Sequence, residues 1–306
     1  MKKALLSIYT TLITVFCFGQ ITTTKIASKS DQVENAAYDS TQNFLGKEVY
    51  KYLGQELYVK GGVRGGCMDS NFIVSNSIIS YYDISYESLK GKYFKVIEVI
   101  KDPKAEGELK FLYGNKYYLK LQEKTSNSII YSVYDTEYEY DFPFIIVGFF
   151  EKAKKRVVGK EFVIDDSYYD GENDIVTTKP VTVRTGQKWK CIDLTIEEEY
   201  YNLSLILQNS LGEKIDYPYS RFVNSIKNGV YSSAEADRYR QRFGSEIFNT
   251  ILKGKVKIGM TKEMCKLSWG EPTKINATIT SGKKSEQWVY EKNYLYFSNG
   301  ILTAIQ

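Results

Sequence analysis

The stretch KIGMTKEMCKLSWGEP, at residues 257–272, predicts one short amphipathic helix with a defined start and a defined end. Thr261 is a typical N-cap, because its hydroxyl can accept from the free N–H groups of the first helical turn. Gly270 allows the chain to leave the helix, and Pro272 prevents the helix from resuming. One apolar stripe recurs at helical spacing. Its members are Met260, Met264, Cys265, Leu267 and Trp269.

The charged side of this helix holds Lys262, Glu263 and Lys266, which we expect to face water. The sulfur atoms of the apolar stripe raise the alternative of soft-metal or thiol chemistry. Met and Cys at helical spacing usually pack in a core, so we predict a structural role for them.

The segment EQWVYEKNYLYFSNGILTAIQ, at residues 286–306, predicts an antiparallel meander. Asn299 and Gly300 separate two apolar runs, and both tolerate the positive φ that a tight hairpin requires. Helices followed by such a meander form two layers. We therefore expect Trp269 of the helix and Trp288 of the sheet to meet in one core.

Two further helices are predicted just before this region. Ser232 and Glu235 have the spacing of a capping box at the start of the first helix. Ser245 is the expected cap of the second helix, and Gly254 can close it in a left-handed conformation.

These residues resemble the SmpA/OmlA (BamE-type) small envelope domain, whose fold is shared with β-lactamase inhibitor protein modules. The resemblance rests on G-x-V-x-I-G-M-T-K-E, W-G-x-P, EQWVY, YLYF and NG-x-L-T, and covers about residues 232–306. It implies a module that binds other proteins and is not an enzyme. The region is C-terminal here, whereas it forms the whole of the assembly lipoproteins. The most specific positions are Gly259, Met260, Thr261, Trp269, Gly270 and Pro272.

The first 19 residues have the layout of a secretory signal peptide, because Lys2 and Lys3 precede a short apolar run. Cys17 raises the alternative of a lipid anchor, but Phe16 and Thr14 do not fit a lipoprotein signal. We expect cleavage after residue 19, a flexible leader at 20–43, and export to the periplasm or the exterior. No later apolar run reaches the roughly 18 residues that a membrane span needs.

Composition excludes several function classes. The chain has no histidine, which removes Ser-His-Asp and Cys-His catalysis and His-rich metal sites. After loss of Lys2 and Lys3, 39 basic residues face 37 acidic ones, a net charge of +2 that is too small to indicate nucleic-acid binding. No cofactor is expected. Cys67, Cys191 and Cys265 would remain, enough for one disulfide at most.

Two stretches resemble each other and predict a diverged duplication. LGKEV (45–49) matches VGKEF (158–162), FKVIEV (94–99) matches WKCIDL (189–194), and YYLKL (117–121) matches YYNLSL (200–205). Apolar and polar residues alternate in these stretches, and the chain contains 27 tyrosines; both features favour strands.

The predicted fold is therefore an α+β multidomain chain. Two small antiparallel β-rich modules, SH3-like in size, span residues 44–156 and 157–222. A two-layer domain of helices and an antiparallel sheet, the SmpA/OmlA-like region, spans residues 223–306.

The acidic run DDSYYDGEND is the candidate cation site, because Ca²⁺ prefers several carboxylates on a loop. Its spacing misses the EF-hand pattern, and a solvated loop is the favoured interpretation. The candidate ligands are Asp165, Asp166, Asp170 and Asp174.

The favoured function is an exported, non-enzymatic envelope protein that binds another envelope protein through its C-terminal module. The first alternative is a carbohydrate-binding protein that uses exposed tyrosines. The second is a hydrolase that uses two carboxylates, for which Glu197, Glu198 and Glu199 or the loop that begins at Asp165 are candidates.

Overall fold

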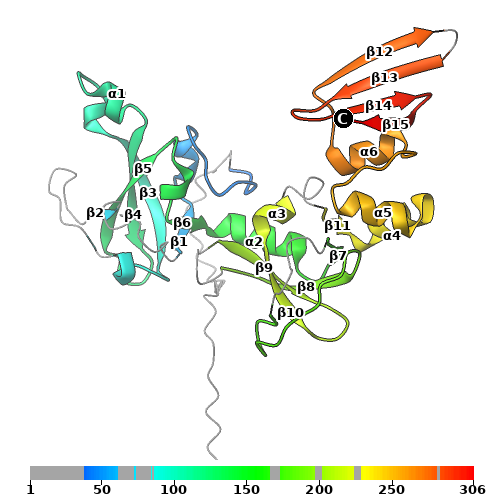
Figure 1. The fold of residues 1–306 in the computed structure, drawn as a ribbon. Helices are drawn as coiled ribbons and strands as arrows, with labels where there is room; N and C mark the ends of the chain where they lie inside the picture. The colour runs from blue at the N-terminus through cyan, green and yellow to red at the C-terminus, as the bar shows by residue number, and fades with distance from the viewer. Residues whose placement is uncertain are drawn as a thin grey trace, which may run out of the picture.

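The computed structural model describes residues 38–60, 72–73, 84, 86–165, 173–196, 202–223, 229–280 and 283–306. Within these ranges the chain forms three antiparallel sheets and six α-helices, so the protein is mixed α/β and mostly β (Figure 1). No helix in the described ranges is both long enough and apolar enough to cross a membrane.

The first sheet has the strand order β2-β5-β4-β3-β1-β6. Its strands are β1 (Glu56–Val59), β2 (Phe72–Ile73), β3 (Tyr93–Lys101), β4 (Lys116–Glu123), β5 (Ile129–Asp135) and β6 (Phe144–Ile146). Between them lie η1 (Val49–Tyr52), η3 (Tyr86–Ser88), η4 (Pro103–Ala105), α1 (Lys110–Tyr113) and η5 (Glu139–Asp141). After the β3-β4-β5 meander, the chain passes through η5, and β6 pairs back with β1.

The second sheet has the order β10-β9-β8-β7-β11. Its strands are β7 (Glu161–Val163), β8 (Lys188–Ile196), β9 (Leu203–Gln208), β10 (Lys214–Pro218) and β11 (Tyr231–Ser232). The path repeats that of the first sheet. A meander is followed by the short helix α3 (Tyr219–Val223), and β11 then pairs back with the first strand of the set, β7.

The pairing registers of the two sheets also correspond. Leu57 of β1 lies opposite Phe94 of β3, and Phe162 of β7 lies opposite Trp189 of β8. Phe94 and Trp189 are both fully buried. The structure thus places these two residues on corresponding strands, as the sequence repeat predicts.

Both central strands contain an irregularity at the same point. The register shifts between Val96 and Glu98 in β3 and between Cys191 and Asp193 in β8, 95 positions later in each case. A bulge of this kind places one extra residue in the strand and increases its twist. The matched bulges extend the correspondence from strand order to local geometry.

Two of the three matched segments need correction. The structural partner of VGKEF (158–162) is LGQEL (53–57), whereas LGKEV (45–49) leads into η1, which begins at Val49. Gly54 and Gly159 have φ of 78° and 82°, and their amides donate to β3 and β8 at equivalent positions. Both candidate segments contain Gly-x-Glu, so composition alone could not separate them.

The match between YYLKL (117–121) and YYNLSL (200–205) is shifted by two residues relative to the pairing of the strands. Leu121 lies opposite Val96, and Leu207 lies opposite Cys191, so Leu121 corresponds to Leu207 and not to Leu205. Side chains alternate with a period of two, so a two-residue slip leaves the same residues facing the core. The pattern alone therefore does not fix this register.

Helix α2 (Val147–Val157) lies between the two sheets in the chain and contributes to the second core. Its buried residues Phe150, Ala153 and Val157 pack with the second sheet in a cluster that also includes Tyr58 and Ile145 of the first sheet. Helix α2 was not predicted from the sequence, lies almost wholly within the predicted first module (44–156), and joins the cores of the two sheets.

The third part contains α4 (Ser233–Phe243), α5 (Ser245–Leu252), α6 (Lys262–Trp269) and a sheet ordered β12-β13-β14-β15 (Figure 1). The strands are β12 (Lys274–Thr280), β13 (Lys283–Val289), β14 (Tyr294–Ser298) and β15 (Ile301–Ile305). Its core also includes Val163 and Tyr231 of the second sheet, so the two parts are in contact.

The predicted helix starts are mostly correct. Ser232 and Glu235 form the capping box of α4, and the Thr261 hydroxyl accepts from the Met264 amide at the start of α6. Ser245 is an exception, because it is the first residue of α5 and Gly244 is the N-cap without a side-chain bond. Here the sharp turn between two consecutive helices replaces a cap.

Candidate functional site

A hollow of about 360 Å³ lies where β1, β3 and β4 meet the β4–β5 turn. Glu56, Lys95 and Gln122 stand directly opposite one another on three adjacent strands, so they form one row on the same face. Their strand neighbours Leu57, Phe94 and Leu121 are buried, which directs the row away from the core. We call these three residues the first polar row.

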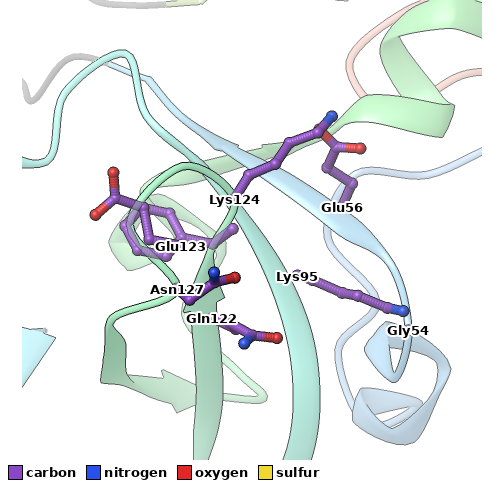
Figure 2. Close-up of a pocket in the computed structure, with 8 residues that line it drawn as sticks. Gly54, Glu56, Lys95, Gln122, Glu123, Lys124 and Asn127 are labelled. Carbon is purple, nitrogen blue, oxygen red and sulfur yellow. The ribbon is translucent and has the colours of Figure 1, made fainter. Parts of the chain in front are cut away.

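An ion pair closes one side of the hollow. Lys124 lies 2.7 Å from the carboxylate of Glu56, and Figure 2 shows Lys124 reaching across to it while Glu123 points to the opposite side. Hydrogen bonds from Ser126 and Ser128, with Lys92 nearby, hold the pKa of Glu123 below its usual value. Both carboxylates of the hollow thus have polar partners within the first part of the chain.

The second sheet repeats the polar row. Glu161 lies opposite Lys190, and Lys190 lies opposite Gln208. Because the two sheets share their register, Glu161, Lys190 and Gln208 are the counterparts of the first polar row, residue for residue. We call them the second polar row. Neither row was predicted from the sequence, although the Gly-x-Glu of LGQEL and the Leu-x-Leu-Gln found in both β4 and β9 were signals for them.

The chemistry of these rows suits binding. Each presents a carboxylate, an ammonium group and an amide, so each can accept from and donate to a polar ligand. Within the first hollow, the carboxylates of Glu56 and Glu123 interact with lysine or serine side chains.

The residues of the C-terminal motif are mainly structural. Met260 is fully buried, Gly270 ends α6 with φ of 77°, and Asn299 and Gly300 form the left-handed hairpin turn that the sequence predicts. Gly259 also has a positive φ, and its amide donates to Leu302 of β15.

The two tryptophans of this region join the same core in different ways. Trp288 is fully buried against Phe297. Trp269 is half-buried at the margin, contacts Tyr290 edge-to-face, and donates from Nε1 to the carbonyl of Gly254 at 2.9 Å. Pro272 follows α6 in the connection to β12.

The prediction that Lys262, Glu263 and Lys266 face water is correct for Glu263 and only partly correct for the lysines, whose side chains are 30% exposed at Lys262 and 40% exposed at Lys266. Lys262 lies 2.6 Å from the buried carboxylate of Glu286, and the ammonium group of Lys266 lies over the ring of Trp288. The helix pattern contained no signal for this, because the partners lie on a strand about 20 residues later.

The outer strand β12 is different from the rest of this sheet. Ile275 and Ile279 share a face with Trp288 and Leu295, the face on which the helices pack. Glu286, Trp288, Leu295 and Phe297 on this face of β13 and β14 are buried, whereas Ile275 is 47% exposed and Ile279 is 73% exposed. The side chain of Lys284, opposite Ile279 on β13, is 54% exposed. In Figure 1, β12 is the strand of this sheet farthest from α6.

The predicted cation site is only partly described. Asp166 and Asp170 lie outside the described residues, as do Glu197, Glu198 and Glu199. Asp174 is buried and accepts from three main-chain amides, those of Val176, Thr177 and Lys214. These bonds, led by that from Lys214, lower its pKa to about 2. Asp174 thus ties its loop to β10.

In the described part of the chain, no three His, Cys, Asp or Glu side chains are arranged to hold a metal ion. Of the four candidate ligands, Asp165 and Asp174 belong to the described residues.

The cysteines that the structure describes are free thiols. Cys191 lies in the second core and Cys265 in the third, and burial raises the pKa of each to about 12. They do not form a disulfide with each other. Cys67 lies outside the described residues.

No family model, curated protein or solved structure matches the chain.

Proposed function

We propose that the protein is an exported, non-enzymatic envelope protein that binds another protein chain through its C-terminal, BamE-like region. The first 19 residues act as a cleaved signal peptide in this proposal, and Cys17 carries no lipid. The two β-rich modules are diverged copies, SH3-like in size, in which a short helix precedes the last strand. The open edge of β12 is the observation that supports protein binding.

The main-chain groups at this edge can be assigned from the pairing of the neighbouring strands. The main-chain N–H of Tyr290 donates to the carbonyl of Asn293, and the N–H of Asn299 donates to the carbonyl of Lys284. The even-numbered residues of β13 therefore direct their main-chain groups towards β14. The odd-numbered residues of β13 therefore bond to β12. Their partners in β12 are even-numbered. It follows that Ile275, Ala277 and Ile279 direct their N–H and C=O groups outward.

Such an edge is a template for another strand. Proteins usually protect exposed edges with charges, prolines or bulges, and residues 275–280 of β12 contain no charge and no proline. The opposite edge, β15, is covered in part, because Gly259 and Met260 exchange hydrogen bonds with Leu302. An extended chain on β12 would gain main-chain bonds and would cover exposed isoleucine.

Site-specific photo-crosslinking tests the proposal. A photo-reactive residue placed at Ile279 in the full chain should give a discrete protein adduct in cells that export it. The matched control is the same residue at Phe111, which is 80% exposed on α1 of the first part. Ala277→Pro should remove the adduct, because it deletes an outward N–H. No adduct at Ile279, or equal adducts at both positions, refutes binding at β12.

A second candidate function is supported by the duplicated polar rows. Two equal sites on one chain increase the apparent affinity for a ligand with repeating units, such as a polysaccharide. The most exposed of the described tyrosines lie on separate elements, in η1, before η5 and on β14. The polar rows therefore support this candidate better than stacking of a sugar on tyrosine rings does. These tyrosines are Tyr50, Tyr138 and Tyr294.

Co-sedimentation with insoluble polysaccharides tests this candidate. Lys95→Ala and Lys190→Ala should each weaken retention, and the double variant should weaken it by more than the product of the single effects. Equal retention of all four proteins excludes the rows as the binding sites.

A further inference from the structure

We infer that the chain that pairs with β12 is a second copy of this protein, joined strand to strand in antiparallel orientation about Ala277. This inference rests on the proposed function of the edge and names its partner. The two copies would form one continuous eight-stranded sheet across a two-fold axis, because each contributes a four-stranded sheet.

The first argument is the hydrogen-bonding pattern. In an antiparallel pair, opposed residues that both face the partner exchange two main-chain bonds. The outward residues of β12 are Ile275, Ala277 and Ile279, which are evenly spaced. Centring the pair on Ala277 places Ile275 opposite Ile279 of the second copy and Ala277 opposite its counterpart. All three outward positions are then matched, giving about six inter-chain bonds.

The second argument is the side-chain pattern of the strand. Residues 275–279 are Ile-Asn-Ala-Thr-Ile, nearly the same in both directions. Self-pairing about the centre sets isoleucine against isoleucine, alanine against alanine, and Asn276 against Thr278. An interface between two copies must be self-complementary, and an unrelated partner places no such requirement on the strand.

The third argument is the match of the two faces. A two-fold axis perpendicular to the sheet keeps the helix-covered faces of both copies on one side. Ile275 and Ile279 belong to that face, so the exposed isoleucines of both copies lie beside one another. Cross-strand contact between them covers apolar surface that the single chain leaves open.

The electrostatics beside the strand permit this approach. Glu286 lies opposite Ala277 on β13, and its carboxylate is paired with Lys262 at 2.6 Å and Lys284 at 2.7 Å. The nearest charged group to the two-fold axis on this face is therefore compensated within each copy. Two copies can approach without bringing unpaired like charges together.

Sedimentation velocity of the full mature chain tests the inference. We expect a concentration-dependent dimer, and Ala277→Pro should weaken it about tenfold or more by removing the central outward N–H of each copy. The N–H of Ala277 makes no bond within its own sheet, so the fold should be kept. Near-UV dichroism of Trp288 monitors this. Ile301→Lys, at a 41% exposed position on the opposite edge strand, is the matched control and should leave the dimer unchanged.

A charge-pairing experiment tests the register. One variant combines Ile275→Lys with Ile279→Lys, and the other combines Ile275→Glu with Ile279→Glu. Each should be monomeric alone, because like charges then face each other, and an equimolar mixture should form heterodimers.

Each remaining outcome overturns a distinct claim. A chain that stays monomeric up to about 100 μM, far above the Kd of a specific dimer, overturns self-pairing. In that case the proposed function is tested separately by the crosslink at Ile279, which must then contain a different protein. A dimer that survives Ala277→Pro, or charged variants that do not associate when mixed, shows that the contact is not β12 in this register.

Discussion

The buried carboxylate of Glu286 should contribute strongly to the stability of the C-terminal region. Its side chain is 6% exposed, contacts Lys262 and Lys284, and accepts from the indole N–H of Trp288. The hydrogen bond from Lys262 is the first cause of a pKa lowered to about 2. Compared with the ordinary value of 4.5, this corresponds to about 3 kcal/mol of stability at neutral pH.

We predict that Glu286→Gln lowers the free energy of unfolding by about 2–3 kcal/mol at pH 7, because both lysines lose their partner while the shape is kept. A group whose pKa is lowered by folding stabilises the fold above its unfolded value. That contribution is complete above about pH 4.5 and is lost as the pH falls towards 2. The difference in the free energy of unfolding between the unaltered chain and Glu286→Gln, called the gap below, should therefore decrease as the pH falls from 4.5 towards 2.

Urea unfolding followed by tryptophan fluorescence measures the gap at pH 7, 5, 4 and 3. Glu263→Gln is the matched control, since the Arg242–Glu263 pair is exposed and should contribute less than about 1 kcal/mol. A gap at pH 7 no larger than that of the control, or one that is constant from pH 7 to pH 3, refutes the role assigned to Glu286.

Three further predictions concern single residues. Asp174→Asn should destabilise the second sheet by about 1–2 kcal/mol above pH 4, and amide exchange should show a loss of protection at Lys214, whose N–H donates to Asp174. Because folding lowers the pKa of Asp174 to about 2, this destabilisation should decrease as the pH falls towards 2. Gly159→Ala should cost about 1–2 kcal/mol in urea unfolding, because φ is 82° there and no atom lies within 4 Å of the added carbon to cause a further clash. Trp288→Ala should cost about 3–5 kcal/mol, and Trp269→Ala about 1–2 kcal/mol, because only Trp288 is fully buried; equal losses would contradict their different burial.

Features that depend on local sequence were predicted well. The caps at Ser232 and Thr261 and the turn at Asn299 and Gly300 agree with the structure, because each depends on residues within one turn of the chain. Trp288 was likewise placed correctly in the core. The strands were predicted from the alternation of apolar and polar residues, because successive side chains of a strand point to opposite faces.

Features that depend on distant partners were not predictable in the same way. The orientation of Lys262 is set by Glu286, 24 residues later, and a helical pattern contains no information about that contact. The exposed edge of β12 depends on the order of the strands, which alternation does not specify. The offset between Leu121 and Leu205 has the same origin, since period-two patterns fit two registers equally well.

The repeated polar rows show what the two sheets retained while their cores changed. At corresponding inward positions Leu57 is replaced by Phe162, Phe94 by Trp189 and Val96 by Cys191, each a change of volume that a core accommodates only by repacking.

The outward rows are identical at every position, although exposed residues can usually be exchanged at little cost in stability. Cross-strand attraction between Glu and Lys amounts to well under 1 kcal/mol, which is a weak reason to keep all three residues. Some core residues are also identical, since Leu121 corresponds to Leu207 and both are buried, but burial gives a reason to keep them. Burial does not explain the identity of the three outward pairs, which therefore favours the two rows as surfaces that contact a ligand.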